Sequence, residues 1–135
     1  MNNKAAAPNL DWLAARHGQA VIRRLVDEKG VKASDADNII TKALGVLQED
    51  GLYACFLYLL AKEKTKGQAV VEEMISLLEN LGFGWGRPDG DSAEKVLDYI
   101  TKKVTVKLEP LLLAKGTLEQ MLVYARYGAK ARAKE

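Results

Sequence analysis

The stretch Gln68–Leu81 reads QAVVEEMISLLENL, and it decides the fold class of the chain. Its apolar residues recur with the spacing of one face of an α-helix, at i, i+3, i+4, i+7 and i+10. These residues are Val71, Met74, Ile75, Leu78 and Leu81. The stretch is therefore predicted to form an amphipathic helix with one side against a core.

Helical patterns also lie on both sides of this stretch. We predict further helices at residues 11–29, 34–50, 52–64, 92–103 and 117–133. Ser34 and Ser92 are the predicted N-caps of two of them, and Thr117–Gln120 fits a capping box. Gly18 weakens the first helical pattern, and Val104–Leu108 alternates like a short extended piece. The predicted fold is all-α: a compact bundle of about six helices, forming a single domain at residues 10–135 after a disordered tail at 1–9.

The run Leu52–Ala61 is apolar throughout, which predicts the central buried helix. A strand is the alternative for so short a run, but its Leu and Ala content and its helix-forming flanks favour a helix. Cys55 lies inside the run, so we expect a small buried hydrophobe. It is the single cysteine, which excludes an internal disulfide.

Composition narrows the class of protein. The chain has 135 residues, a net charge of +2 and 48% hydrophobic residues, which is typical of one globular domain. Its start, MNNKAAAPN, lacks the apolar segment of a signal peptide, and no apolar run is long enough to span a membrane. We therefore expect a cytoplasmic protein that does not contact membranes.

Residue usage gives no indication of catalysis. Zinc sites need several Cys and His ligands, and the chain has one of each, Cys55 and His17. A nucleophilic triad would have to use His17, and no serine lies in a glycine-framed turn. We therefore expect no enzyme activity, no metal and no cofactor. An enzyme with an unusual carboxylate site remains a rival hypothesis.

Residues 82–91 read GFGWGRPDGD, which predicts a loop. Its glycines resemble a phosphate cradle only superficially, because the preceding strand and the Gly-Lys-Ser/Thr ending of a P-loop are missing. A surface loop is the favoured interpretation. Phe83 and Trp85 within it are candidate protein-interface residues, since exposed aromatic side chains often contact a partner. The alternative is that one or both pack onto the core.

Two segments carry a family resemblance: Val46–Lys62, VLQEDGLYACFLYLLAK, and residues 117–133, TLEQMLVYARYGAKARA. The first has a helix ending at Asp50–Gly51, followed by a very apolar helix ending in Leu-Ala-Lys. The second alternates aromatic, basic and small residues. Together they resemble the small helical subunit of type III CRISPR effector complexes, in its Cmr-type (type III-B) form.

The resemblance implies a non-catalytic subunit that stacks in several copies as a minor filament beside other CRISPR effector subunits. It implies partners of guide RNA and target RNA, held through phosphate contacts. Phosphate binding needs long cationic side chains on a rigid face. Three groups are candidates: Arg126, Lys130 and Lys134; Arg16, Arg23 and Arg24; and Lys62, Lys64 and Lys66. The main rival is a helical protein–protein adaptor without RNA contact.

Overall fold

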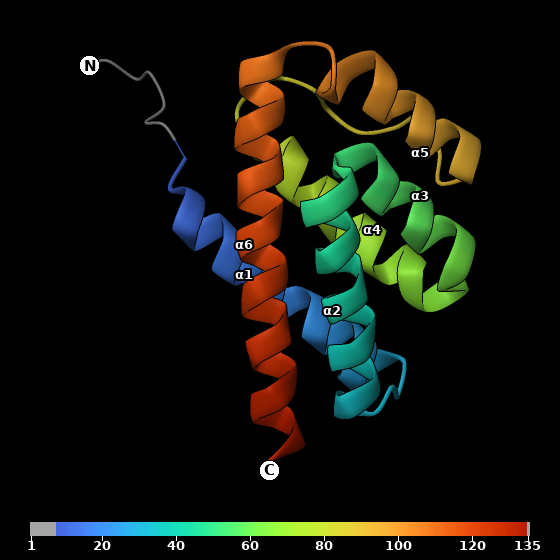
Figure 1. Cartoon of the computed structure of the whole chain (residues 1–135), viewed down its shortest axis with the longest axis vertical. Helices are drawn as coiled ribbons and strands as arrows, with labels where there is room; N and C mark the ends of the chain where they lie inside the picture. The colour runs from blue at the N-terminus through green and yellow to red at the C-terminus, as the bar shows by residue number, and fades with distance from the viewer. Residues whose placement is uncertain (1–7, 135) are drawn as a thin grey trace.

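Figure 1 shows the computed structural model of the chain, which describes residues 8–134. Within this span there are six α-helices and two π-helical segments, and no strand. In chain order they are α1 (Leu10–Ile22), η1 (Arg23–Glu28), α2 (Ala33–Asp50), α3 (Leu52–Lys62), α4 (Lys64–Glu79), α5 (Ala93–Tyr99), η2 (Ile100–Val104) and α6 (Leu108–Ala133). The segments η1 and η2 directly continue α1 and α5. The predicted all-α, single-domain bundle is confirmed.

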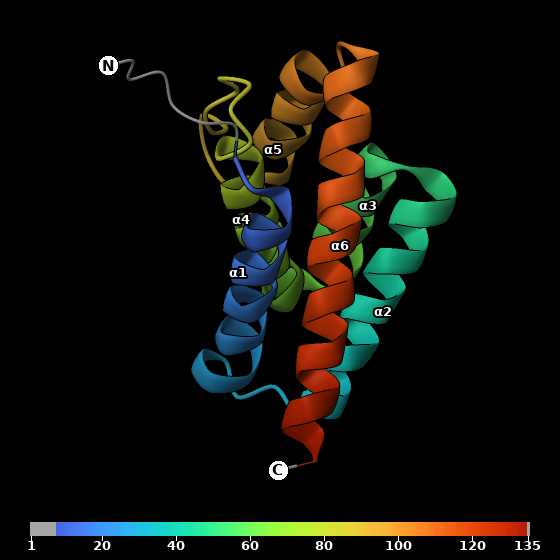
Figure 2. The same ribbon diagram turned by 90° about the vertical axis from the view of Figure 1, so that its left-hand side faces the viewer.

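The longest helix, α6, organises the bundle. Figure 2 shows α6 in front, with α1 on its left and α2 on its right, and these two pairs make the most extensive helix contacts. Helices α3 and α4 pack on the far side of this layer, α3 against α2 and α4 against α1. The segment α5–η2 lies across one end, next to the N-terminal part of α6 (Figure 1). The core therefore lies between α6 and the α3–α4 pair.

Gly18 has a packing role in this layer. A Cβ atom added to Gly18 would lie 2.9 Å from the carbonyl oxygen of Met121 in α6, closer than real Cβ contacts. Only glycine lets α1 approach α6 this closely. The residue that weakens the helical pattern of the sequence is thus the residue that permits the close contact between α1 and α6.

The observed N-caps confirm one predicted helix start and change two others. Asn9 was assigned to the disordered tail, but it is the N-cap of α1, and its side chain accepts a hydrogen bond of 3.0 Å from the backbone N–H of Trp12. Residues 1–7 of that predicted tail lie outside the described residues. The predicted cap Ser34 is also wrong: α2 begins at Ala33, and Ser34 lies inside its first turn. Ser92 is confirmed, since its hydroxyl accepts from the N–H of Lys95.

The predicted capping box at Thr117 is also wrong. Helix α6 runs unbroken from Leu108 to Ala133, and the Thr117 hydroxyl donates to the carbonyl of Leu113 at 2.8 Å, as a threonine inside a helix does. Pro110 lies in the first turn, where a missing N–H costs nothing, so the helix begins nine residues earlier than predicted. Residues 105–107 bend into this helix, and no extended piece forms at Val104–Leu108.

Helix α3 is less buried than its composition predicts. Leu52, Cys55, Phe56 and Leu59 are buried, whereas Leu57 and Tyr53 are exposed, Leu57 at 45%. The expectation of a helix buried all round is therefore wrong, because α3 lies at the edge of the bundle. Cys55 is buried as predicted; its thiol donates to the carbonyl of Ala43, and burial raises its pKa to about 12.

Candidate nucleic-acid interface

The basic residues proposed for RNA binding fall into three different environments. On α1 and η1, Arg24 lies 2.6 Å from a carboxylate oxygen of Glu72 and 3.1 Å from one of Glu73. The guanidinium of Arg16 lies over the ring of Trp12, 5.2 Å from its centre. Arg23 is exposed and has no ion pair within the described part of the chain. This group is therefore split between internal contacts and solvent.

Arg24 belongs to an ionic cluster, which we define as His17, Arg24, Glu72 and Glu73. Inside it, Nδ1 of His17 lies 2.6 Å from a carboxylate oxygen of Glu73, and both side chains are buried. Burial raises the pKa of Glu73, but the hydrogen bond with His17 and the charge of Arg24 outweigh it and hold the pKa below its usual value. The cluster joins α1 and η1 to α4, so the role of Arg24 here is structural.

The C-terminal stripe consists of Arg126, Lys130 and Lys134, and two of these three side chains also form ion pairs within the fold. Nε of Arg126 lies 3.8 Å and Nζ of Lys130 3.2 Å from the carboxylate of Asp37 on α2. Lys134 is exposed and unpaired among residues 8–134. Exposed ion pairs are worth about 0–1 kcal/mol, so a phosphate can compete for these two side chains, but it must displace Asp37.

The third group lies where α3 turns into α4. Lys62, Lys64 and Lys66 are exposed, and none of them forms an ion pair with a described residue. Lys64 has a positive φ of 50°, an uncommon conformation for a residue with a side chain, and it marks the sharp turn between the two helices. The predicted basic hinge is thus a one-residue break at Glu63, since Lys64, Lys66 and Gly67 already belong to α4.

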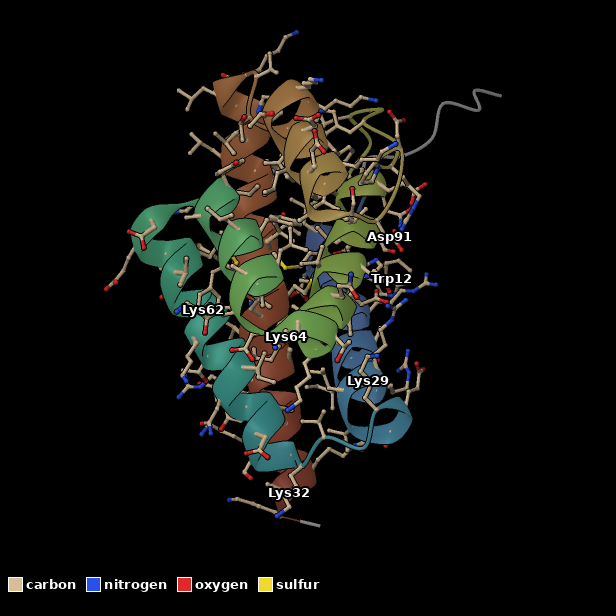
Figure 3. The ribbon with its side chains drawn as sticks, turned by 90° about the vertical axis from the view of Figure 1, so that its right-hand side faces the viewer. Trp12, Lys29, Lys32, Lys62, Lys64 and Asp91 are labelled. Carbon is tan, nitrogen blue, oxygen red and sulfur yellow. The ribbon has the colours of Figure 1, made fainter. Side chains whose placement is uncertain are left out.

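Two lysines that were not predicted join this group. Lys29 follows η1 and Lys32 precedes α2, and Figure 3 shows both on the side of the molecule that carries Lys62 and Lys64. A groove of about 320 Å³ lies between η1 and α4, lined by Glu28 and Lys29 on the η1 side and by Thr65 and Gln68 on α4.

We call Lys29, Lys32, Lys62 and Lys64 the lysine face. These four side chains have no ion-pair partner in the described span. They come from the ends of η1, α2, α3 and α4, so packed helices fix their separations. The sequence shows each lysine but not that the turn after η1 lies beside the α3–α4 junction, so it does not predict that Lys29 and Lys32 join this group.

The glycine-rich loop holds its two aromatic side chains differently. Phe83 is exposed at 37%, whereas Trp85 packs back onto the core, as the alternative interpretation of the loop expects for one of the two residues. The ring centres lie 4.8 Å apart with the planes tilted by 36°. Tyr99 donates to the carbonyl of Gly86 at 2.9 Å, and Arg87 pairs with Glu79 at 2.9 Å. The loop is therefore attached to α4 and α5.

Residues 8–134 contain no group of three or more His, Cys, Asp or Glu side chains placed to hold a metal ion. None of the helices in that span combines the length and apolarity needed to cross a bilayer, since α6 carries charges along its length.

Comparison with known proteins gives no assignment. None of the protein-family models, curated proteins or solved structures compared with this chain matches it.

Proposed function

We propose that this chain is a non-catalytic, RNA-binding small subunit of a type III CRISPR effector complex, a cytoplasmic ribonucleoprotein of antiviral defence. In this role several copies stack as a minor filament and contact the duplex of guide and target RNA. The observation that carries the RNA contact is the lysine face, with its unpaired cations on a rigid side of the bundle. The resemblance of residues 46–62 and 117–133 to the Cmr-type subunit supports the assignment to this complex.

The chemistry of the lysine face suits phosphates rather than bases. Lysine binds phosphate as a point charge, and such contacts position a protein on a duplex without reading its sequence. A subunit that must accept any guide sequence needs this kind of contact. The groove beside Lys29 is also lined by Glu28 and Glu72, which disfavour a phosphate inside it. We therefore expect the RNA backbone to follow the lysine tips and not to enter the groove.

Self-association is supported by a different surface, the outer side of α6. Leu112, Leu113 and Tyr127 point away from the core and are exposed at 56%, 41% and 61%. Exposed apolar side chains in such number often mark a protein contact. Figures 2 and 3 view the molecule from opposite sides, and α6 is in front in the first and behind the other helices in the second. Copies joined through α6 would leave the lysine face open to RNA.

The RNA contact is tested with two charge-matched triple variants. One replaces Lys32, Lys62 and Lys64 by glutamine, and the other replaces Arg126, Lys130 and Lys134. Affinity for a labelled RNA duplex is measured by fluorescence anisotropy at several salt concentrations. We expect the first variant to bind more weakly and to lose about 0.9 from the salt slope for each phosphate contact removed, with a smaller change in the second. Equal RNA affinity of the first variant and the unmodified protein would contradict the proposal that the lysine face binds RNA.

The assignment to a CRISPR complex needs a separate measurement. The tagged protein is purified from its native source, and the accompanying RNA and proteins are identified by sequencing and mass spectrometry. Larger effector subunits together with short repeat-derived RNAs are the expected result. Protein partners without RNA would instead support the adaptor, which the exposed side chains of α6 favour independently. In that case binding would depend weakly on salt and strongly on Leu112 and Tyr127.

A further inference from the structure

A hollow of about 390 Å³ lies at the end of the bundle, where the glycine-rich loop meets η2 and the start of α6. The loop contributes Phe83 and Trp85 to its lining. The segment from η2 to α6 contributes Lys102, Lys103, Val106 and Lys107. The lining therefore combines aromatic rings and three cationic side chains, and it includes no carboxylate. Volumes of about 300–1,000 Å³ are typical of small-molecule sites.

The backbone of the loop fixes the aromatic side of this hollow. Gly82, Gly84 and Gly86 have φ values of 92°, 75° and 65°, which side-chain-bearing residues rarely adopt. The aromatic residues alternate with them, so the glycines direct both rings. Nζ of Lys103 donates to the carbonyl of Trp85 at 3.2 Å and ties the loop to η2. The hollow is therefore formed before any ligand arrives, which lowers the entropic cost of binding.

The two rings give the hollow a place for a flat ligand. Trp85 is buried and supports Phe83, whose ring centre lies 4.8 Å away, and Phe83 is exposed. Val106, exposed at 62%, adds apolar surface to the same hollow. A planar heterocycle can stack on an exposed phenyl ring, as bases do in proteins that bind single strands.

The lysines of the hollow can bind a negatively charged group of the same ligand. Lys107 is exposed and has no ion pair with any residue of the described span. Nζ of Lys102 lies 3.6 Å from a carboxylate oxygen of Asp98, but the Lys102 side chain is 73% exposed, so this ion pair is weak. Lys103 is partly committed to the loop through Trp85. The anionic group therefore belongs beside Lys102 and Lys107.

We propose that this hollow binds a nucleoside phosphate, with the base on Phe83 and the phosphate held by Lys102 and Lys107. The ligand is either a free mononucleotide or the terminal nucleotide of an RNA strand. None of the residues of this nucleotide hollow belongs to the lysine face, so each site can be tested without the other. The proposal does not rest on the CRISPR assignment.

The fluorescence of Trp85 can report ligand binding, because Trp85 lines the hollow. The chain has two tryptophans, Trp12 and Trp85, so the variant Trp12→Phe leaves Trp85 as the single tryptophan. Trp12 is exposed on α1 and lies outside the hollow. Adenosine 5′-monophosphate is titrated into this variant while tryptophan fluorescence is recorded. We expect saturable quenching, with much weaker effects of adenosine or inorganic phosphate at equal concentration, because each supplies only half of the contacts.

Substitutions then test the two halves of the site in the same background. Phe83→Ala should weaken nucleotide binding by about 5- to 150-fold, the range that 1–3 kcal/mol of base stacking gives. Lys107→Gln should weaken the nucleotide without changing the affinity for adenosine. Lys115→Gln is the matched control, since Lys115 lies on α6 outside the lining and should bind like the parent. Thermal unfolding followed by circular dichroism checks that each variant is folded.

A 5′-phosphorylated oligoadenylate distinguishes the two sources of the ligand. Tighter binding of the oligonucleotide than of the mononucleotide identifies a strand end, and equal binding identifies a free nucleotide. Three results would overturn the proposal: no quenching by the mononucleotide, equal quenching by inorganic phosphate, or unchanged affinity in a folded Phe83→Ala variant.

Discussion

The ionic cluster and the lysine face both contain basic residues that the sequence suggests for RNA binding, yet they differ in what surrounds them. In the ionic cluster, Arg24 has two glutamates within 3.1 Å, one of them buried and bonded to His17. On the lysine face, Lys62 and Lys64 have no ion-pair partner among residues 8–134. A cation therefore contributes to folding or to ligand binding according to the carboxylates that the fold places beside it.

The largest effect is expected where the ionic cluster is broken. Glu73→Ala leaves the buried ring of His17 without its carboxylate partner and removes one of the two carboxylates that pair with Arg24, and removing one partner of a buried pair costs about 3–5 kcal/mol. Urea unfolding followed by circular dichroism measures this loss. Glu72→Ala is the matched control: its side chain is 45% exposed, so we expect a loss below about 1 kcal/mol. Equal losses in the two variants would remove the distinction between buried and exposed members of the cluster.

The same cluster predicts how stability depends on pH. The folded-state pKa of Glu73 lies below its usual 4.5, so the ionised carboxylate stabilises the fold above about pH 4.5. That contribution is lost as the pH falls through the lowered pKa. Unfolding free energies measured from about pH 7 to pH 3 should therefore fall less steeply in Glu73→Gln than in the parent. Parallel curves would show that Glu73 does not titrate with folding.

Substitutions on the lysine face should leave stability almost unchanged and weaken RNA binding. Replacing Lys62 and Lys64 by glutamine removes no internal ion pair, so the unfolding free energy should change by less than about 0.5 kcal/mol. Affinity for an RNA duplex should nevertheless fall measurably at low salt, because two phosphate contacts are lost. Anisotropy and urea unfolding on the same preparations separate the two effects. A stability loss equal to that of Glu73→Ala would place these lysines in the fold and not in binding.

A small effect is also expected at Asp37, whose carboxylate pairs with both Arg126 and Lys130. Asp37→Asn removes their counter-charge and should cost no more than about 1 kcal/mol of stability. If the C-terminal stripe also meets RNA, the same variant should bind a duplex more tightly than the parent, since a competing carboxylate is gone. Unchanged affinity would confine the RNA contact to the lysine face.

The local patterns of the sequence predict most helices well. Apolar spacing places α2 and the α5–η2 segment close to their observed limits, whereas α4 begins four residues before the predicted helix at 68–81; Ser92 caps α5 as its residue type suggests. The predicted helix limits and burial are wrong where one sequence pattern is compatible with two different structures. Pro110 can start a helix as well as end one, so α6 begins before the predicted capping box. The composition of α3 predicts a buried helix, but only the packing shows that Leu57 faces solvent.

The sites are less predictable because they depend on distant segments. His17 and Glu73 are 56 residues apart and on different helices, and no local signal joins them. Lys29 and Lys62 are likewise brought to one side by the fold (Figure 3). The glycines of residues 82–86 indicate a loop, but their positive φ values and the bond from Lys103 to Trp85 emerge only from the structure.

The pairing of α1 with α6 has a consequence for biosynthesis. The two helices are near opposite ends of the described chain, yet Gly18 packs on the backbone of Met121, the Tyr124 hydroxyl bonds to Asp11, and Arg132 pairs with Asp27. Contacts between such distant residues form slowly and late. A ribosome-bound chain that still lacks α6 therefore exposes the apolar sides of α1 and α2. We expect productive folding only after α6 has left the exit tunnel, which makes the nascent chain a candidate for chaperone binding until then.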